Sequence, residues 1–319
     1  MRSTAHRHPL PLAPRRRPAR LPDLPHPHQP LARPDRHHPH PDRGPGRHGT
    51  ARQPVTPPPT PPRPGDCHLW AWPVTSSPTL RTLLTQDEAT HADTLPPGPP
   101  RATYTTSRAL QRTLASHYLG IPAHQLHIDR TCHHCGAAHG RPRLPAAIGQ
   151  LDYSVAHTRH WVLAAVVSQG LIGLDIDTTP DPQTTRRLSR NTLTVSEQQE
   201  LARLPEAARA AAFVRLWTRK EAGSKLTGHG IAARFAHLDA AGPTLRPAGD
   251  LPAGWPQDAV HLHDLPPSGP LGTGHHAALA TTSRIERILL PTAWEQDPHP
   301  LGPHYTVSTS ASSTRSRTP

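Results

Sequence analysis

Two aspartates separated by a single residue, Asp175 and Asp177, follow the apolar run 171–174. In an extended strand, residues i and i+2 point to the same side, about 7 Å apart, so both carboxylates would face one side of a strand anchored in the core. Carboxylates this close repel unless a cation lies between them. Hard oxygen ligands with no Cys or His close by favour Mg²⁺ or Mn²⁺ over zinc. The alternative is a strand end that faces solvent.

A second group of reactive side chains lies on a predicted helix. Trp217, Glu221 and Lys225 stand at i, i+4 and i+8 and share one helical face. One interpretation is an exposed ion pair between Glu221 and Lys225. However, the chain contains 35 Lys and Arg residues, of which only Lys220 and Lys225 are lysines, and both lie in this segment. Lysine is a compact charge that can donate a proton, so the pattern indicates phosphate contact or acid–base chemistry.

Together, segments 173–177 (Gly-Leu-Asp-Ile-Asp) and 217–225 (Trp-Thr-Arg-Lys-Glu-Ala-Gly-Ser-Lys) resemble the 4′-phosphopantetheinyl transferases of the surfactin-synthetase-activating (Sfp) type. The resemblance covers residues 67–290 and leaves both tails out. Each motif is short, but five motifs in the right order and spacing are specific. The other three are 140–142 (Gly-Arg-Pro), 153–158 (Tyr-Ser-Val-Ala-His-Thr, with Trp161 behind it) and 228–231 (Gly-His-Gly-Ile).

The resemblance implies transfer of the 4′-phosphopantetheine arm of coenzyme A to a serine of an apo acyl or peptidyl carrier protein, with release of 3′,5′-ADP. The serine hydroxyl attacks the β-phosphorus, which requires neutralised diphosphate charge, a base and a stabilised leaving group. By similarity, Asp175, Asp177 and Glu221 would hold Mg²⁺. Lys225 would contact the transferring or leaving phosphate, and Glu221 or a metal-bound water would be the base. Polyketide, non-ribosomal-peptide and fatty-acid carriers all fit this reaction.

The resemblance also implies roles for five further residues. His157 would contact the 3′-phosphate of coenzyme A, and Arg141 would add a cation at the same end. Arg101 and Arg112 fall where the family has phosphate-binding and structural arginines, with Arg112 in the better register. Glu197 falls where some members place another catalytic carboxylate. It is also the fourth residue of the capping box 194–197, so both roles remain open.

The chain departs from the family pattern at a few positions. Asp177 stands where Glu is commoner, which shortens the reach to the metal by one methylene. Ala156 replaces a serine whose hydroxyl could touch phosphate, Arg141 replaces a lysine, and Thr103 lies where a basic residue is expected. None of these changes removes a metal ligand, so we expect an active enzyme.

The segment Cys132-His133-His134-Cys135, followed by His139, resembles a zinc knuckle. A structural zinc ion needs four ligands. Cys132, Cys135 and His139 supply three, and no second Cys-x-x-Cys is present. We therefore expect a loop without metal here.

Apolar periodicity and stop signals outline the elements that position these groups. We expect a strand at 68–72, a helix over 107–119 that ends at Gly120, and a helix over 194–204. A longer helix should begin with Pro205 at its first position and end at Gly228. The runs 161–167 and 171–176 should form a hairpin across 168–170, and 277–280 with 285–290 should repeat it.

This order predicts an α+β fold of two similar α/β halves in a pseudo-twofold arrangement, the 4′-phosphopantetheinyl transferase fold. The halves are expected at 66–180 and 181–290, between disordered tails at 1–65 and 291–319. Pairing of the halves within one chain favours a monomer.

The charge of the 319-residue chain is unevenly distributed. Residues 1–65 hold 19 of the 43 prolines, 12 Arg and three Asp, and so carry nine of the net +12 charges. This excludes a basic globular nucleic-acid binder, since the excess lies where almost nothing can be buried. The longest apolar run, 161–167, is too short to span a bilayer, and three cysteines are too few for a disulfide scaffold. We therefore expect a cytoplasmic protein without membrane contact.

Two other functions remain open. One is an Mg²⁺- or Mn²⁺-dependent Asp-x-Asp nucleotide-sugar transferase, which requires helices between parallel strands. The other is a non-enzymatic nucleic-acid binder that acts through the basic tail, with steep salt dependence. For that tail, a solvated low-complexity extension is the preferred interpretation.

Overall fold

The structure is a computed structural model of the protein. It describes residues 60–132, 135–265, 271, 274–290 and 307–308. All of them belong to one unit of the chain, Thr56–Pro319. The expected disordered tails therefore lie outside the described residues, apart from 60–65 and 307–308.

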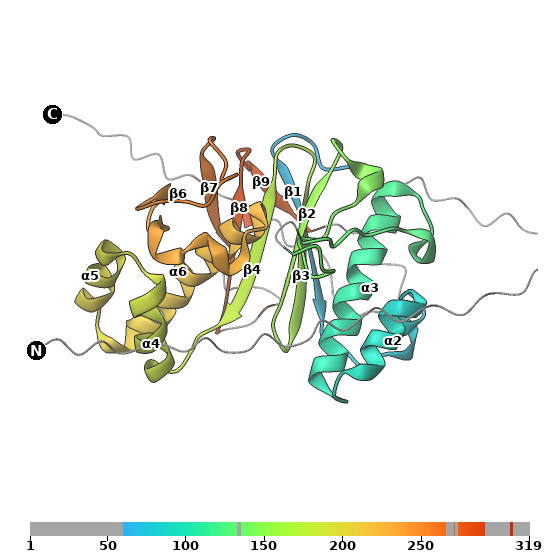
Figure 1. The fold of residues 1–319 in the computed structure, drawn as a ribbon, viewed down its shortest axis with the longest axis horizontal. Coiled ribbons are helices and arrows are strands. Elements are labelled where there is room, and N and C mark those ends of the chain that lie inside the picture. Colours follow the sequence, from blue (N-terminus) through green and yellow to red (C-terminus); the bar gives the residue numbers. More distant parts are fainter. Residues whose placement is uncertain (1–59, 133–134, 266–270, 272–273, 291–306, 309–319) are drawn as a thin grey trace, which may run out of the picture. The chain divides into compact units, whose positions relative to one another are not determined.

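The strands form two five-stranded sheets (Figure 1). Their orders are β10-β9-β1-β3-β2 and β4-β8-β7-β6-β5. Among the strands that the structure describes, β1 and β9 are the only parallel pair. The helices-between-parallel-strands arrangement of a nucleotide-sugar transferase is therefore contradicted. The strands are β1 (Asp66–Pro73), β2 (Asp152–His157), β3 (Trp161–Val167), β4 (Ile172–Thr178), β5 (Leu238–Asp239), β6 (Thr244–Pro247), β7 (Val260–Leu265), β8 (His275–Thr281), β9 (Arg287–Leu289) and β10 (Val307–Ser308).

The two hairpins expected from the sequence are wrong. β3 pairs with β1 and β2 in the first sheet, whereas β4 pairs with β8 in the second. Likewise, β8 and β9 belong to different sheets. The apolar runs 161–167 and 277–280 are buried on both faces of their sheets, so periodicity does not identify the partner strand. Gly170, at φ +73°, turns the chain between the sheets.

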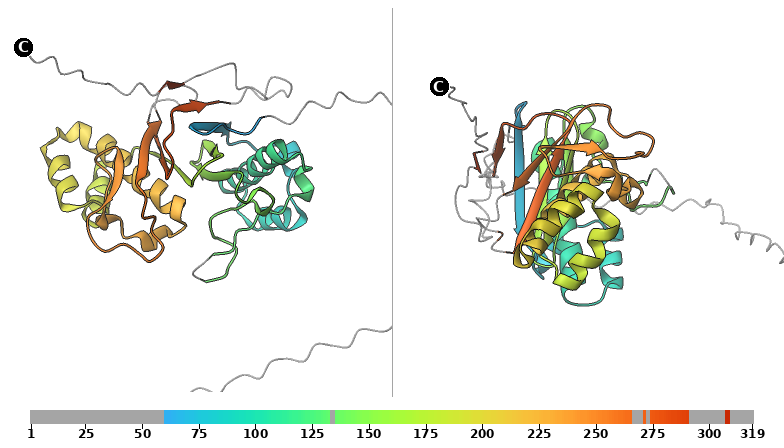
Figure 2. Two further views of the ribbon diagram at one scale, coloured as in Figure 1. Left: turned by 90° about the horizontal axis from the view of Figure 1, so that it is seen from above. Right: turned by 90° about the vertical axis from the view of Figure 1, so that its left-hand side faces the viewer.

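Alternate side chains of a strand enter different cores. Trp70 and Trp72 of β1 join the core beneath α3 (Pro99–Leu119), whereas Leu69 and Ala71 join the core between the two sheets. A third core packs α6 (Glu206–Thr227) against the far face of the second sheet. The layers are therefore helices, sheet, sheet and helices. Figures 1 and 2 show α3 and α6 on opposite sides of the strands.

The helices end where the sequence predicts. α3 stops at Gly120 and α6 at Gly228, both in the left-handed region with φ +65° and +77°. α3 begins eight residues before the expected start, because its first turns bury threonines that apolar periodicity does not count. Pro205 is the N-cap of α6 and not its first residue. The other helices are α1 (Pro78–Arg81), α2 (Gln86–Thr94), α4 (Pro182–Thr192) and α5 (Val195–Arg203).

The mixed α+β class is confirmed, and the pseudo-twofold relation remains a prediction. The boundary expected at residue 180 does not separate the sheets, because β4 precedes it and lies in the second sheet, while β9 follows it and lies in the first. Among the described helices, none combines the length and apolarity needed to cross a bilayer.

Candidate active site

One face of β4 carries the predicted carboxylates. Its other face places Ile172, Leu174 and Ile176 in the core between the sheets, so Asp175 and Asp177 share the opposite face, as their spacing predicts. Gly173 precedes them on that face, against α6. A Cβ on Gly173 would lie only 1.9 Å from the carbonyl oxygen of Ala222. Because Gly173 has no side chain, the backbone of β4 can approach α6 closely (Figure 1).

This close approach brings Asp175 to the helix face that carries Glu221 and Lys225. Lys225 Nζ donates a hydrogen bond to Asp175 Oδ1 at 2.6 Å. The side chain of Asp175 is 9% exposed and that of Lys225 is 34% exposed. Burial raises the pKa of the Asp175 carboxyl; Lys225 opposes this rise and Asp177 adds to it.

The pKa of Glu221 depends on the same neighbouring charges. Its pKa is raised to about 7, first by burial and then by the negative charge of Asp175. Lys225 lowers this pKa and Asp177 raises it further. The structure therefore brings together Asp175, Asp177, Glu221 and Lys225, which the sequence places in segments 40 residues apart.

The chemistry of these donors fits a hard divalent cation such as Mg²⁺. All three acidic groups offer carboxylate oxygens, and three carboxyl groups face the single ammonium of Lys225. Burial is the main cause of the raised pKa values of Asp175 and Glu221, and the neighbouring carboxylates raise them further. The three do not form a ligand cluster in which one oxygen of each lies within 4.8 Å of the others. Gathering them around one ion therefore requires side-chain movement, including at the Asp175–Lys225 pair.

Positive side chains surround the end of β2 near this acidic group. His157, the last residue of β2, is exposed, yet protein atoms beside its ring lower the pKa of the imidazole. The positive charges of Lys225 and Arg108 lower it further. The site thus combines a carboxylate side on β4 and α6 with a second side that holds the imidazole of His157 and the cations Lys225 and Arg108. This second side is called the cationic side below.

Sequence reasoning did not identify Arg108. It lies on α3, half-buried, with its guanidinium 4.9 Å above the ring centroid of Tyr104. The signal was present in the sequence, because Arg101, Arg108 and Arg112 stand at i, i+7 and i+11 and share one helical face. The resemblance implies roles for Arg101 and Arg112 and none for Arg108.

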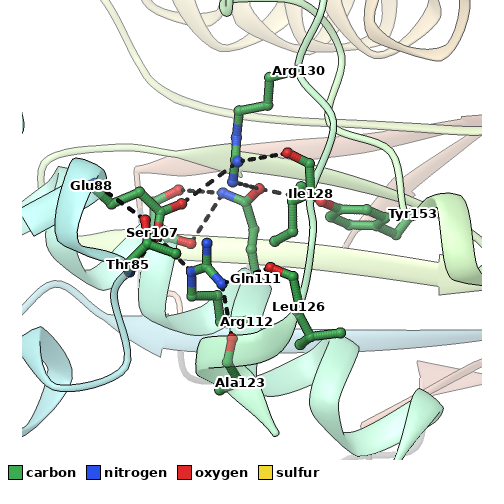
Figure 3. Close-up of polar contacts among 10 residues, drawn as sticks. All are labelled: Thr85, Glu88, Ser107, Gln111, Arg112, Ala123, Leu126, Ile128, Arg130 and Tyr153. Carbon is green, nitrogen blue, oxygen red and sulfur yellow. Dashed lines mark hydrogen bonds and ion pairs between the residues drawn. The ribbon is translucent and has the colours of Figure 1, made fainter. Parts of the chain in front are cut away.

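Arg112 has structural partners instead (Figure 3). Its Nε donates to Glu88 Oε2 at 2.5 Å, and its Nη1 donates to the carbonyl oxygens of Ala123 and Leu126 at 2.8 and 3.1 Å. Only 4% of its side chain is exposed. Arg130 lies 3.6 Å from the second oxygen of Glu88 and extends the network. The structure does not bring Arg112 to the candidate site.

Arg101 is also engaged elsewhere. Its guanidinium donates to the backbone oxygens of Leu95 at 2.8 Å and of Asp93 at 3.2 Å, where α2 ends. These contacts fix the connection between α2 and α3. Arg101 shows no contact with the acidic group among the described interactions.

Arg141 connects β2 and β4 at the end of β4 that lies away from Asp175 and Asp177. It forms an ion pair with Asp152 at the start of β2 and donates to the carbonyl oxygen of Ile172 at 2.9 Å. Asp152 in turn accepts from the Ile172 N–H at 2.7 Å. Arg141 lines a cleft of about 460 Å³ together with Arg143, Tyr153 and other residues. Its Nε is buried without a hydrogen-bond partner in the structure.

Glu197 caps α5 and pairs with the other lysine. Its Oε2 accepts from the Thr194 N–H at 2.8 Å and from Lys220 Nζ at 2.5 Å, and its Oε1 accepts from the Ala240 N–H at 2.8 Å. The side chains of Glu197 and Lys220 are both fully buried. Lys220 also donates to the Thr192 and Phe235 carbonyl oxygens. The capping box is therefore present, and both oxygens of Glu197 are engaged away from Asp175.

Comparison with known proteins points to the same region. Residues 171–269 match the 4′-phosphopantetheinyl transferase superfamily, and this match contains both β4 and α6. The chain is also similar to the 4′-phosphopantetheinyl transferase HetI of Nostoc sp. (strain PCC 7120 / SAG 25.82 / UTEX 2576). The identity is 27% over 173 residues, which cover 52% of this chain and 70% of the relative. Both comparisons support a 4′-phosphopantetheinyl transferase, so the expectation of an enzyme of this kind is confirmed.

Proposed function

We propose that this protein is an Sfp-type, Mg²⁺-dependent transferase that moves the 4′-phosphopantetheine arm of coenzyme A onto a serine of an apo carrier protein. One observation carries the proposal: Asp175 and Asp177 from β4 share a site with Glu221 and Lys225 from α6, inside the segment that matches the superfamily. Acyl and peptidyl carriers, including those of polyketide and non-ribosomal-peptide synthesis, are the proposed partners, and the proposed enzyme is a monomer.

The metal-binding residues in this proposal are Asp175, Asp177 and Glu221. When bound there, Mg²⁺ supplies a Lewis acid that neutralises diphosphate charge. Lys225 contributes a mobile ammonium that can leave Asp175 Oδ1 for a phosphate oxygen, since both are anionic acceptors. Glu221, or a water held by the metal, is the proposed base that accepts the proton of the carrier serine.

The adenosine 3′-phosphate is assigned to the cationic side of the site. His157 and Arg108 lie close enough for the charge of Arg108 to lower the pKa of His157. A dianionic phosphate placed between them would accept hydrogen bonds from both and would favour protonation of His157. Arg108 thus takes the phosphate-binding role that the resemblance implied for an arginine of this segment.

The remaining residues that the sequence singled out take supporting roles. We assign Glu197 to the cap of α5 and to the buried pair with Lys220, and Arg112 to the packing of α3 through Glu88. Arg141 positions β2 against β4 through Asp152. Arg141 also lines the cleft of about 460 Å³ with Arg143, and a phosphate of coenzyme A is the proposed occupant of this cleft.

The full chain, incubated with coenzyme A, Mg²⁺ and an apo carrier protein, tests the proposal. We expect the carrier to gain the mass of one phosphopantetheine group, and the gain to be lost with Asp175→Asn and with Glu221→Gln. Glu200→Gln, at an exposed acidic residue of α5, is the matched control and should leave transfer intact. No mass gain with acyl, peptidyl or fatty-acid carriers would reject the proposal.

A further inference from the structure

The chain between α3 and β2 contains a loop whose two legs run antiparallel. Asp129 and Arg143 exchange backbone hydrogen bonds of 3.0 and 2.8 Å, and the Gly140 N–H donates to the Arg130 oxygen at 2.7 Å. A Cβ on Gly140 would lie 2.6 Å from the backbone oxygen of Thr131. The absence of a side chain at this position therefore lets the two legs approach each other closely.

Three metal-ligating side chains meet at the tip of this loop. One ligand atom from each of Cys132, Cys135 and His139 lies within 4.8 Å of the other two. Cys135 Sγ lies 3.0 Å from His139 Nε2. Over the described ranges of the chain, this is the only group of three Cys, His, Asp or Glu residues with that spacing. Cys132 is buried, whereas Cys135 and His139 are exposed.

The backbone of the loop favours this cluster. The Gly136 N–H donates to the Cys132 oxygen at 2.8 Å, and the Cys132 N–H donates to the Ala137 oxygen at 2.9 Å. Gly136 has φ +74°, a left-handed conformation that turns the chain directly after Cys135. The His139 N–H also donates to the Ala137 oxygen. These backbone contacts shape the segment that carries the three side chains.

We propose that Cys132, Cys135 and His139 bind one Zn²⁺ ion. Two thiolates and a neutral imidazole are the ligands that Zn²⁺ prefers, whereas Mg²⁺ prefers carboxylates and water. Binding releases the two thiol protons to solvent, and the two thiolate charges neutralise the ion. The sequence-based objection that three ligands are too few does not hold for an exposed site, because a water molecule fills the fourth tetrahedral position.

Such an ion would cross-link the tip of the loop. The second leg of this loop leads to Arg141. Arg141 follows Gly140 directly and holds Asp152 and the Ile172 oxygen. A zinc ion at the tip therefore acts as a staple for the segment that positions β2 against β4. The proposed site is independent of the transferase reaction, and the test below does not measure transfer.

The experiment uses the full chain, reduced, stripped of metal and titrated with Co²⁺, which replaces Zn²⁺ and reports thiolate ligands through a sulfur-to-cobalt charge-transfer band. We expect this band in the wild-type protein, at one equivalent of Co²⁺, and its loss when one equivalent of Zn²⁺ is added. Residues 1–65 contain eight histidines, which can bind Co²⁺ but cannot give a thiolate band. The band therefore separates the loop site from this segment.

Two variants locate the ligands. Cys135→Ser, at an exposed position, should abolish or strongly weaken the band, and His139→Ala should shift it and weaken Zn²⁺ binding. His124→Ala, at an exposed histidine outside the cluster, is the control and should match the wild type. X-ray absorption of the zinc-loaded protein should give two sulfur and two nitrogen or oxygen neighbours. A wild-type protein without the band, a band unchanged in Cys135→Ser, or a Cys132–Cys135 disulfide that persists in reductant would each overturn the proposal.

Discussion

Lys225 reaches back from α6 to Asp175 on β4, and their side chains meet at 2.6 Å. The pair joins two segments that lie 50 residues apart in the sequence. It also places one positive charge among three carboxylates, of which Glu221 and Asp175 have raised pKa values.

Glu221 should make the stability of the metal-free protein depend on pH. The folded-state pKa of about 7 lies above the ordinary value of 4.5, so the folded state favours the protonated carboxyl. Its contribution to stability is complete below about pH 4.5 and is lost as the pH rises to about 7. The side chain in Glu221→Gln cannot ionise. In a chelator, the melting temperature of this variant minus that of the wild type should therefore rise between about pH 4.5 and 7 and stay constant at higher pH. A difference that is independent of pH would contradict the raised pKa.

The same carboxylates should couple stability to Mg²⁺. At pH 8, added Mg²⁺ should raise the melting temperature of the wild-type protein, because a ligand that binds only the folded state stabilises it. Asp175→Asn and Glu221→Gln should lose this response, and Glu200→Gln should keep it. Equal Mg²⁺ responses in all four proteins would place the ion elsewhere.

Gly173 should tolerate no side chain. Gly173→Ala places a methyl group 1.9 Å from the Ala222 oxygen, so β4 and α6 must separate. We expect a loss of about 1–3 kcal/mol in the free energy of unfolding, measured by urea denaturation, together with reduced transfer. Gly242→Ala is the matched control, since nothing lies within 4 Å of a Cβ at that position. Similar losses for both variants would refute the close contact.

His157 and Arg108 should recognise the 3′-phosphate of coenzyme A. His157→Ala and Arg108→Ala should each raise KM for coenzyme A about 10- to 100-fold, the value of a hydrogen bond to a charged group. With dephospho-coenzyme A, which lacks that phosphate, each variant should match the wild type. Arg101→Ala should behave alike with both substrates, because Arg101 binds the end of α2. An equal effect of His157→Ala on both substrates would remove His157 from the phosphate site.

The two lysines of α6 should show opposite phenotypes. Lys220 and Glu197 form a fully buried pair, so Lys220→Ala should cost about 3–5 kcal/mol in the free energy of unfolding by leaving Glu197 without its partner. Lys225→Ala, at a partly exposed position, should reduce kcat by roughly 10²- to 10³-fold with little change in stability. A stable but inactive Lys220→Ala variant would instead place Lys220 in the chemistry.

Much of the site was predictable because its residues follow local periodicity. The i, i+2 spacing of Asp175 and Asp177 on a strand, and the i+4 spacing of Glu221 and Lys225 on a helix, each fix a shared face. The partners of Arg112 and Arg141 were not predictable in this way. Their carboxylates, Glu88 and Asp152, belong to other secondary-structure elements, and whether an arginine meets a ligand or a carboxylate depends on how those elements pack.

The sheet pairing failed for a related reason. The runs that form β3 and β4 are close in sequence and both apolar, which favours a hairpin when only local rules are applied. In the structure β3 pairs with its sequence neighbour β2 and with the distant β1, and β4 pairs with the distant β8. The apolar pattern of a single strand does not reveal which distant strand pairs with it.

The strand β4 lies near the middle of the chain, but its sheet neighbour β8 lies near the end of the described residues. This separation determines when Asp175 and Asp177 can reach their final neighbours. During synthesis β4 leaves the ribosome long before β8, its sheet neighbour, so a nascent chain that has reached only residue 180 presents β4 as an unprotected edge. We therefore expect fragments that stop there to aggregate and not to form a small independent domain. Asp175 and Asp177 of β4 therefore reach their final surroundings only after β8, near the end of the described chain, has been synthesised.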